Sequence, residues 1–175
     1  MRFISETAGI EKLADIRSEF TSEIRGSYEH KARPCSACDS PGICCRDAHF
    51  VNVRITRLEA AGIDSVLKSL GPGRRNSVHA RVDQTIATYR LTDDDGGEPK
   101  TYACPLFESG TGCLVHETAK PLPCIAHACY DDPGDLPPDE LLVERETEIF
   151  KLNRLVYGKD IACSPIPLAI ARFGK

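Results

Sequence analysis

Cysteine is the residue of this sequence whose number and spacing could do chemistry. The chain has nine cysteines among 175 residues, and eight of them fall into two groups. A Cys-x2-Cys pair in a turn directs both sulfur atoms at one centre, which is why thiolate metal sites use this spacing. The sequence therefore predicts a metal ion or cluster held by cysteine thiolates. The first group is Cys35-x2-Cys38-x5-Cys44-Cys45, and the second is Cys104-x8-Cys113-x10-Cys124-x4-Cys129.

Neither group alone has the spacing of a common thiolate motif. A zinc ribbon has a second Cys-x2-Cys pair, whereas the second group here is more widely spaced. The bacterial ferredoxin run Cys-x2-Cys-x2-Cys-x3-Cys-Pro is absent. Cys35 follows a proline in a loop, which does not fit a thioredoxin-like βαβ setting. We therefore expect residues 35–45 and 104–129 to lie against each other, with thiols of both groups in one metal-sized neighbourhood.

The adjacent Cys44 and Cys45 are expected to have different roles. Neighbouring side chains point to opposite faces of an extended chain and diverge by about 100° on a helix. One sulfur would join the centre of Cys35 and Cys38. The other would reach the second group or remain a spare, reactive thiol. Eight thiols could form two four-thiolate sites, or one cluster with four thiols left over.

The combined pattern resembles the bacterial cysteine-cluster proteins known as zinc- or iron-chelating domains. The resemblance covers roughly residues 33–130. Two departures lie in the second group. His116 stands where the family usually has Tyr, and Lys120 to Ile125 replaces Arg-Pro-x-x-Cys-Arg. The matching pieces are the first cysteine group, Cys104-Pro105-Leu106, Cys113-Leu114-Val115-His116 and Lys120-Pro121-Leu122-Pro123-Cys124.

The resemblance implies binding of zinc or of an iron–sulfur cluster through thiolates. Three functions follow as expectations: a structural, zinc-stabilised interaction module, an iron–sulfur protein for electron transfer, or a modification enzyme with an open metal position. The sequence has no Gly-rich nucleotide loop and no recognisable pair of catalytic carboxylates. No catalytic residue or reaction is therefore assigned.

Other candidate ligands are predicted to have supporting roles. His116 and His127 lie inside the second group, but eight thiols already satisfy the ligand count. We expect both histidines to donate hydrogen bonds or to pack beside the ligands. Cys163 stands alone near the end of the sequence, and a buried thiol is the expectation there.

The elements around the cysteines are mostly helical. Apolar residues at three- and four-residue steps predict helices over residues 5–30, 74–90 and 135–158. Alternation over residues 51–56 predicts a short strand. Thr56 and Glu59 form a capping box that begins another helix, with a break expected at Gly62 and Asp64. Residues 92–99 are expected to form a turn, and residues 159–175 an extended tail.

These elements predict a small α+β, metal-centred fold that is mostly α. Irregular cysteine-rich loops and a short strand or hairpin would complete a single domain over residues 1–175. The N-terminal helix is expected over residues 5–30, the metal-binding region over 31–130, the C-terminal helix over 135–158 and the tail over 159–175.

Composition and charge limit the partners and the compartment. The formal net charge is −4, whereas a general nucleic-acid binder normally has a basic surplus. No stretch approaches 18 consecutive apolar residues, so no membrane span is predicted. Acidic residues near the N-terminus do not fit the apolar core of a signal peptide. The expectation is a cytoplasmic protein with reduced thiols, a metal or cluster as partner, and neither nucleic acid nor membrane.

Overall fold

Helices make up 60% of the structure, a computed structural model that describes residues 3–34, 37–46, 51–93 and 100–174. Seven α-helices and three two-stranded antiparallel sheets lie within these residues. The prediction of a mostly α fold with short strands is confirmed. The chain divides into a first unit, Met1–Pro41 with Lys120–Asp160, and a second unit, Gly42–Ala119 with Ile161–Lys175. The assignment of all residues to one domain stays a prediction.

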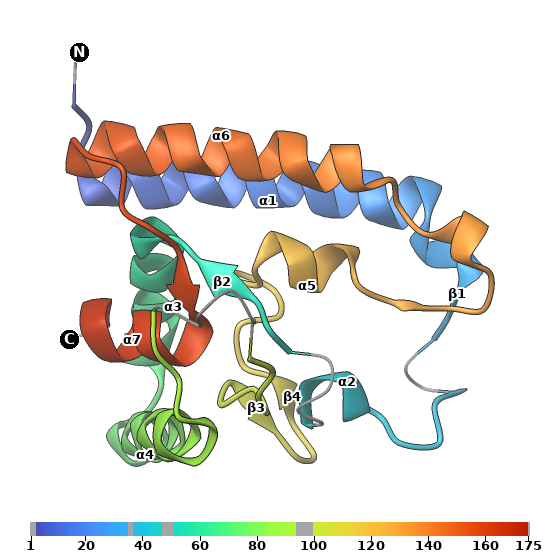
Figure 1. The fold of residues 1–175 in the computed structure, drawn as a ribbon, viewed down its shortest axis with the longest axis horizontal. Coiled ribbons are helices and arrows are strands. Elements are labelled where there is room, and N and C mark those ends of the chain that lie inside the picture. The colour runs from blue at the N-terminus through green and yellow to red at the C-terminus, as the bar shows by residue number, and fades with distance from the viewer. Residues whose placement is uncertain (1–2, 35–36, 47–50, 94–99, 175) are drawn as a thin grey trace. The chain divides into compact units, whose positions relative to one another are not determined.

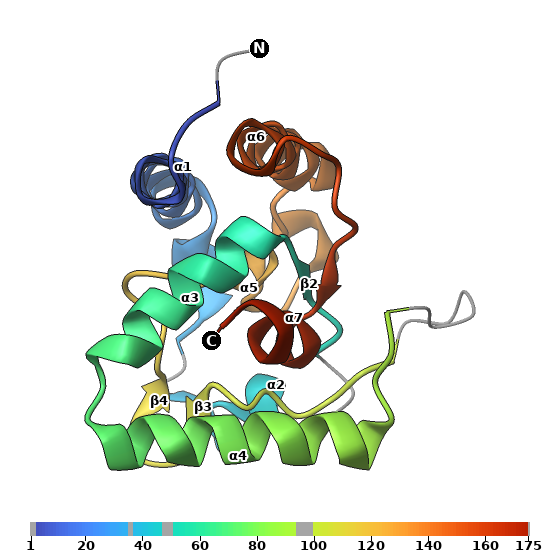
Figure 2. The ribbon, with the colours of Figure 1, turned by 90° about the vertical axis from the view of Figure 1, so that its left-hand side faces the viewer.

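Two long antiparallel helices, α1 (Glu6–Ser27) and α6 (Asp139–Tyr157), form the main part of the first unit. They lie side by side in Figures 1 and 2. The predicted helices over residues 5–30 and 135–158 are thereby confirmed. The Ser5 side chain caps α1 by accepting a hydrogen bond from the Ala8 backbone N–H. Gly158 ends α6 with a positive φ of 73°, a conformation that glycine adopts readily.

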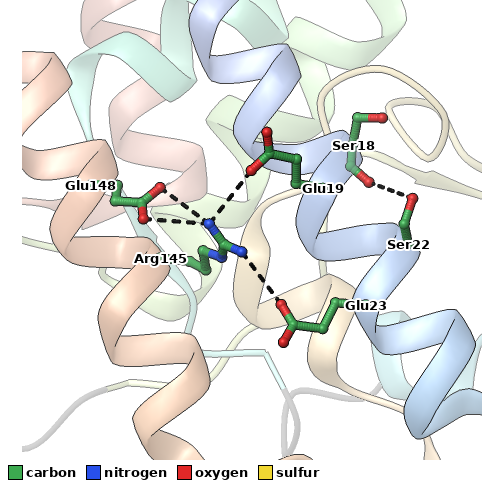
Figure 3. A network of polar contacts seen from close by, with 6 residues as sticks. All are labelled: Ser18, Glu19, Ser22, Glu23, Arg145 and Glu148. Carbon is green, nitrogen blue, oxygen red and sulfur yellow. Dashed lines mark hydrogen bonds and ion pairs between the residues drawn. The ribbon is translucent and has the colours of Figure 1, made fainter.

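An ion-pair network links the two helices. Arg145 of α6 lies 3.5 Å from carboxylate oxygens of Glu19 and Glu23 on α1, and 3.4 Å from Glu148 on its own helix. Figure 3 shows the guanidinium between these three carboxylates. One shared arginine orders several side chains at once, so such a network stabilises more than separate exposed pairs would. The apolar side of the helix pair comprises the buried residues Leu13, Phe20, Ile24, Ile149 and Leu152.

A short helix and a two-stranded sheet complete the first unit. The helix α5 (Leu122–Ala126) packs on both α1 and α6. The strand β1 (Ala32–Arg33) pairs with β5 (Cys129–Tyr130), and Arg33 stands opposite Cys129. Two one-turn 3-10 helices, η1 (Glu29–Lys31) and η3 (Pro133–Asp135), flank these strands.

Three helices enclose the core of the second unit. The helix α7 (Ile166–Phe173) packs against α3 (Arg57–Ser69) and α4 (Pro72–Tyr89), an arrangement visible in Figure 2. The predicted helix over residues 74–90 is confirmed by α4. Short strands lie beside them: β2 (Arg54–Ile55) pairs with β6 (Ser164–Pro165), and β3 (Phe107–Glu108) pairs with β4 (Gly112–Cys113). One further turn of helix, α2 (Ile43–Arg46), precedes β2.

The start of α3 was predicted correctly, but the break within it was not. The Thr56 side chain accepts a hydrogen bond from the Glu59 backbone N–H, and Glu59 accepts one in return from the Thr56 backbone. The helix continues without interruption through Gly62 and Asp64, both of which are buried. A mid-helix glycine costs only about 1 kcal/mol relative to alanine. Burial of the neighbouring apolar side chains outweighs that amount.

The prediction of an extended tail over residues 159–175 is wrong. Residues 164–165 form β6, and residues 166–173 form the helix α7, whose residues Ile166, Ala169 and Ile170 belong to the core. The two prolines caused the error. Pro165 is the N-cap and Pro167 lies in the first turn, where a missing backbone N–H removes no intrahelical hydrogen bond.

Two further sequence expectations concern the turn and the membrane. Residues 94–99 of the expected turn lie outside the described residues. Among the residues that are described, no helix combines the length and hydropathy needed to cross a bilayer.

Tyr102 joins three separate segments of the second unit. Its side chain is fully buried, and its backbone N–H donates to the Val51 carbonyl over 2.8 Å. Its hydroxyl donates to the Val53 carbonyl over 2.7 Å and accepts from the Ile166 N–H over 3.0 Å. This side chain and a direct hydrogen bond of 3.2 Å from the Ile166 N–H to the Val53 carbonyl together hold the start of α7 against the segment before β2.

We predict that Tyr102→Phe destabilises the protein by about 1 kcal/mol, because the Val53 carbonyl and the Ile166 N–H each lose one hydrogen-bond partner but keep the hydrogen bond of 3.2 Å between them. Urea denaturation followed by circular dichroism measures the change. Tyr89→Phe on α4 is the control, since that side chain is not fully buried. Equal stability of the two variants would contradict the role assigned to the Tyr102 hydroxyl.

Candidate functional site

The candidate ligands are distributed over both units. Eight cysteines lie within the described residues, and all eight are thiols rather than disulfides. Cys35 lies outside the described residues, as does His49. Within the first unit the structure places Cys38, Cys124 and Cys129. Within the second unit it places Cys44, Cys45, Cys104 and Cys113, together with Cys163. Each sequence group is thus divided between the two units.

The best-defined part of the site is the turn that begins at Cys104. The Phe107 backbone N–H donates to the Cys104 carbonyl over 3.2 Å, which closes the turn Cys104-Pro105-Leu106-Phe107. The backbone N–H groups of Leu106 and Phe107 also hydrogen-bond to the Cys104 sulfur. Amide donors directed at a sulfur stabilise its thiolate form. This is an environment that a metal-bound cysteine would use.

Burial has the opposite effect on the same thiol. Desolvation raises the pKa of Cys104 from 9.0 to about 12, and the neighbouring Cys113 contributes to the increase. The two amide donors and the Arg81 charge lower this pKa, but by less than burial raises it. The protonated thiol is therefore the stable form of Cys104 up to high pH unless a cation is bound to it.

Cys113 is the last residue of β4, so it lies at the same open end of the β3–β4 hairpin as the Cys104 turn. It stands opposite Phe107 in the sheet, and the Leu114 N–H donates to the Leu106 carbonyl over 3.0 Å. The His116 N–H donates to the Cys113 carbonyl over 3.2 Å, so Cys113 also begins a turn. The hairpin thereby presents two cysteines, each at the first position of a turn.

The helix α2 brings the end of the first cysteine group to this hairpin. The Cys104 backbone N–H donates to the Cys45 carbonyl over 2.8 Å. Because α2 is helical, the side chains of Cys44 and Cys45 diverge along it, as expected for adjacent residues. The expectation that only one of the two sulfur atoms joins the centre of Cys35 and Cys38 stays a prediction. Within the second unit, therefore, two cysteine segments about sixty residues apart are joined by their backbones.

Gly42 allows the close approach of α2 to the hairpin. Its φ is +77°, and a Cβ atom there would lie 2.3 Å from the Phe107 ring. A side chain at this position would be strained by the backbone and would also collide with the aromatic ring. Gly42 thus acts as a spacer between the Cys44–Cys45 turn and the Cys104 hairpin.

Gly42→Ala is therefore predicted to destabilise the second unit by more than about 1 kcal/mol, because alanine is unfavourable at a positive φ. Gly73→Ala is a matched control in the same unit, since a Cβ there meets open space within α4. It should leave stability unchanged or raise it by up to about 1 kcal/mol. Chemical denaturation of both variants provides the comparison, and a neutral Gly42→Ala would refute the packing role.

The raised pKa of Cys104 also predicts a pH dependence for protein prepared without metal. Unfolding would return this thiol to its ordinary pKa of 9.0, whereas the folded value is about 12. The folded state then holds the proton more tightly, so this contribution to stability is complete below pH 9 and is lost as the pH rises toward 12. Urea denaturation across this range should show less alkaline loss in Cys104→Ala than in Cys163→Ala. Parallel curves for the two variants would contradict the prediction.

The cysteines of the first unit lie around the β1–β5 pair. Cys129 is exposed and pairs with Arg33, which forms an ion pair of 2.7 Å with Asp131. Cys124 lies within α5 and is half-buried. Cys38 is also half-buried and follows a turn in which the Ala37 N–H donates to the Pro34 carbonyl over 2.9 Å. The β1–β5 pairing links the start of the first sequence group to the end of the second.

The remaining candidates lie around these segments. The His116 side chain is 48% exposed and lies 3.7 Å from Glu117. His127 ends α5 and is exposed. Cys163 precedes β6, and its carbonyl accepts hydrogen bonds from the Arg54 guanidinium. The supporting roles expected for both histidines stay predictions, and the Cys163 thiol is half-buried rather than fully buried.

Sequence reasoning missed a charged clamp beside the hairpin. Glu108 accepts hydrogen bonds from Arg74 over 2.7 Å and from Arg81 over 3.0 Å. The Arg81 Nε also donates to the Pro105 carbonyl over 3.0 Å. Arg74 and Arg81 are seven residues apart, so they occupy the same face of α4. That spacing was a usable signal, but the sequence did not indicate which acidic residue would meet it.

The side chains as placed do not form a complete metal site. Within the described ranges, no three cysteine, histidine, aspartate or glutamate side chains lie close enough together to hold a metal ion. A metal bound in the second unit would have to draw the sulfur atoms of α2 and the hairpin together. The shared neighbourhood expected for residues 35–45 and 104–129 stays a prediction.

Comparisons with protein-family models, curated proteins and solved structures found no match. The resemblance to the zinc- or iron-chelating domains therefore depends on the cysteine pattern alone. The functional argument that follows uses the residues and contacts of this chain.

Proposed function

We propose that this protein binds zinc or an iron–sulfur cluster through cysteine thiolates. The observation that carries the proposal is the Cys104 turn, in which two backbone N–H groups hydrogen-bond to the sulfur of a half-buried cysteine. Cys113 is close enough to raise the pKa of this thiol, and the Cys45 carbonyl accepts a hydrogen bond from the Cys104 backbone N–H. Two neighbouring thiols, one of them with amide donors to its sulfur, are the start of a thiolate site that a bound cation would complete.

The electrostatics of this arrangement argue against a free nucleophile. A reactive cysteine has a lowered pKa and is partly ionised near neutral pH. The pKa of Cys104 is raised to about 12 instead, so its thiolate would not form near neutral pH without strong positive charge. A metal ion supplies that charge and releases the proton when it binds. Amide donors to the sulfur would then orient and stabilise the bound thiolate.

The proposed ligands of the second unit are Cys44, Cys45, Cys104 and Cys113. Cys38, Cys124 and Cys129 of the first unit complete the described members of the ligand set, and Cys35 belongs to it on sequence grounds. Zinc would be held in tetrahedral geometry at a closed structural site. An iron–sulfur cluster would use the same thiolates for electron transfer. Cysteine thiolates are suitable ligands for both zinc and an iron–sulfur cluster.

The biological role follows from which group is bound. A colourless, redox-silent zinc protein would be a structural, zinc-stabilised interaction module. A brown protein with acid-labile sulfide would be an iron–sulfur protein, and either electron transfer or a modification reaction at an open metal position would then be its role. We place the protein in the cytoplasm, where thiols stay reduced. We propose neither nucleic acid nor membrane as a partner.

The test is metal and sulfide analysis of protein purified without oxygen. Wild-type protein should retain zinc, or iron with sulfide, whereas Cys104→Ser should lose most of the metal bound by the second unit. Cys163→Ser is the matched control, because it removes a half-buried thiol of the same unit that lies outside the proposed ligand set. Circular dichroism checks that both variants fold.

Two results would contradict the proposal. The first is wild-type protein that contains no stoichiometric metal after anaerobic purification. The second is equal metal content in Cys104→Ser and wild type. If Cys163→Ser instead loses metal as Cys104→Ser does, the assignment of ligands is wrong.

A further inference from the structure

The outer face of α6 carries apolar side chains that the first unit leaves exposed. Val143 and Phe150 are 58% and 47% exposed. They are seven residues apart, so they lie on the same face of the helix. Arg145 marks the side of α6 that faces α1, as Figure 3 shows. Val143 precedes Arg145 by two residues, which places the two side chains on roughly opposite sides of the helix.

The two apolar residues belong to a continuous seam along α6. Its members are all exposed and follow one another at alternating steps of three and four residues, the spacing of a seam between paired helices. The hydroxyl at the centre of the seam donates to the Val143 carbonyl over 2.8 Å. Covering the centre would therefore leave no hydroxyl without a hydrogen-bond partner. The seam consists of Glu140, Val143, Thr147, Phe150 and Arg154.

The charges of this face are divided between its two ends. Glu140 and the exposed Glu144 lie toward the N-terminal end of α6. The exposed Lys151 and Arg154 lie toward the C-terminal end. Arg154 also lies 3.6 Å from Asp160, but both side chains are largely exposed, so this pair is weak. The face is therefore acidic at one end, apolar in the middle and basic at the other end.

A second copy of the same face complements this pattern when the two helices run antiparallel. A two-fold contact uses the same patch on both copies, so the acidic end of each helix meets the basic end of the other. Val143 then lies beside Phe150 of the second copy. Glu144 and Lys151 are seven residues apart on one flank of the seam, so each meets its opposite charge across the contact. A parallel arrangement would place like charges together instead.

We infer that the outer face of α6 is a self-association surface through which two copies of this protein pair antiparallel. A contact made by one pair of helices lies at the small end of specific interfaces, below about 1,200 Å² in total, so the dimer is weak and reversible. None of its residues belongs to the proposed ligand set. The inference is therefore independent of the proposed metal binding.

Sedimentation velocity of the full chain in reducing buffer tests the surface. Reductant prevents disulfide-linked dimers through the exposed Cys129. Wild-type protein should change from monomer to dimer as its concentration is raised. Phe150→Ser should raise the dissociation constant by more than about tenfold, because each dimer loses two covered aromatic rings. Circular dichroism checks that this exposed substitution leaves the helices intact.

Charge reversal tests the antiparallel pairing. Glu144→Lys and Lys151→Glu should each raise the dissociation constant by about tenfold, because two attractive pairs become repulsive in a symmetric dimer. An equimolar mixture of the two variants should recover association, since each variant supplies the charge that the other now lacks. A chain that carries both substitutions should recover it as well. Lys12→Glu on the exposed side of α1 makes the same change of net charge and is the matched control.

Four results would overturn the inference. Wild-type protein that stays monomeric at every concentration would assign the face to a different partner. A dimer that Phe150→Ser leaves intact would use another surface. A mixture of the two charge variants that associates no better than either alone would contradict antiparallel pairing. Equal weakening by Lys12→Glu and Lys151→Glu would attribute the effect to net charge instead of to the seam.

Discussion

The second unit depends on the hydrogen bonds made by one buried tyrosine. The Tyr102 hydroxyl bonds to the Val53 carbonyl and to the Ile166 N–H, while its backbone N–H bonds to the Val51 carbonyl. These contacts fix an early segment, a middle segment and the last helix against one another. Cys104 lies two residues beyond this anchor, so the position of its turn follows from the packing of the core. The candidate site is thus an extension of the core rather than a separate loop.

Local signals in the sequence were sufficient for several elements, because short-range physics determines them. The capping box of Thr56 and Glu59 involves neighbours only, and the end of α6 requires only the conformational freedom of Gly158. Residues 159–175 were predicted to be extended because two prolines in a short segment usually interrupt a helix. Their apolar residues form a helix that packs on α3 and α4, which spacing along the chain does not reveal.

The cysteine spacing predicted a chemistry, which stays a prediction, and it did not predict where the cysteines lie in the fold. It did not indicate that each sequence group would be divided between two compact units. The link between Cys45 and Cys104 is a backbone hydrogen bond, which depends on no side-chain type and leaves no pattern in the sequence. The Glu108 clamp was missed for a related reason, since its acceptor lies on a hairpin far from the two arginines in the chain. Long-range pairings of this kind become visible only in three dimensions.

Both units are discontinuous in the chain, and this has a consequence for synthesis on the ribosome. The core of the second unit includes Ile166 and Ile170 of α7. In the chain these residues follow Lys120–Asp160, a segment of the first unit, so the core cannot close until that segment and α7 have both emerged. The Cys104–Phe107 turn and the β3–β4 hairpin are local and can form much earlier. Thiols of a nascent chain are therefore available to solvent while the hairpin already has its shape. The hairpin can therefore take its shape before the core of the second unit closes.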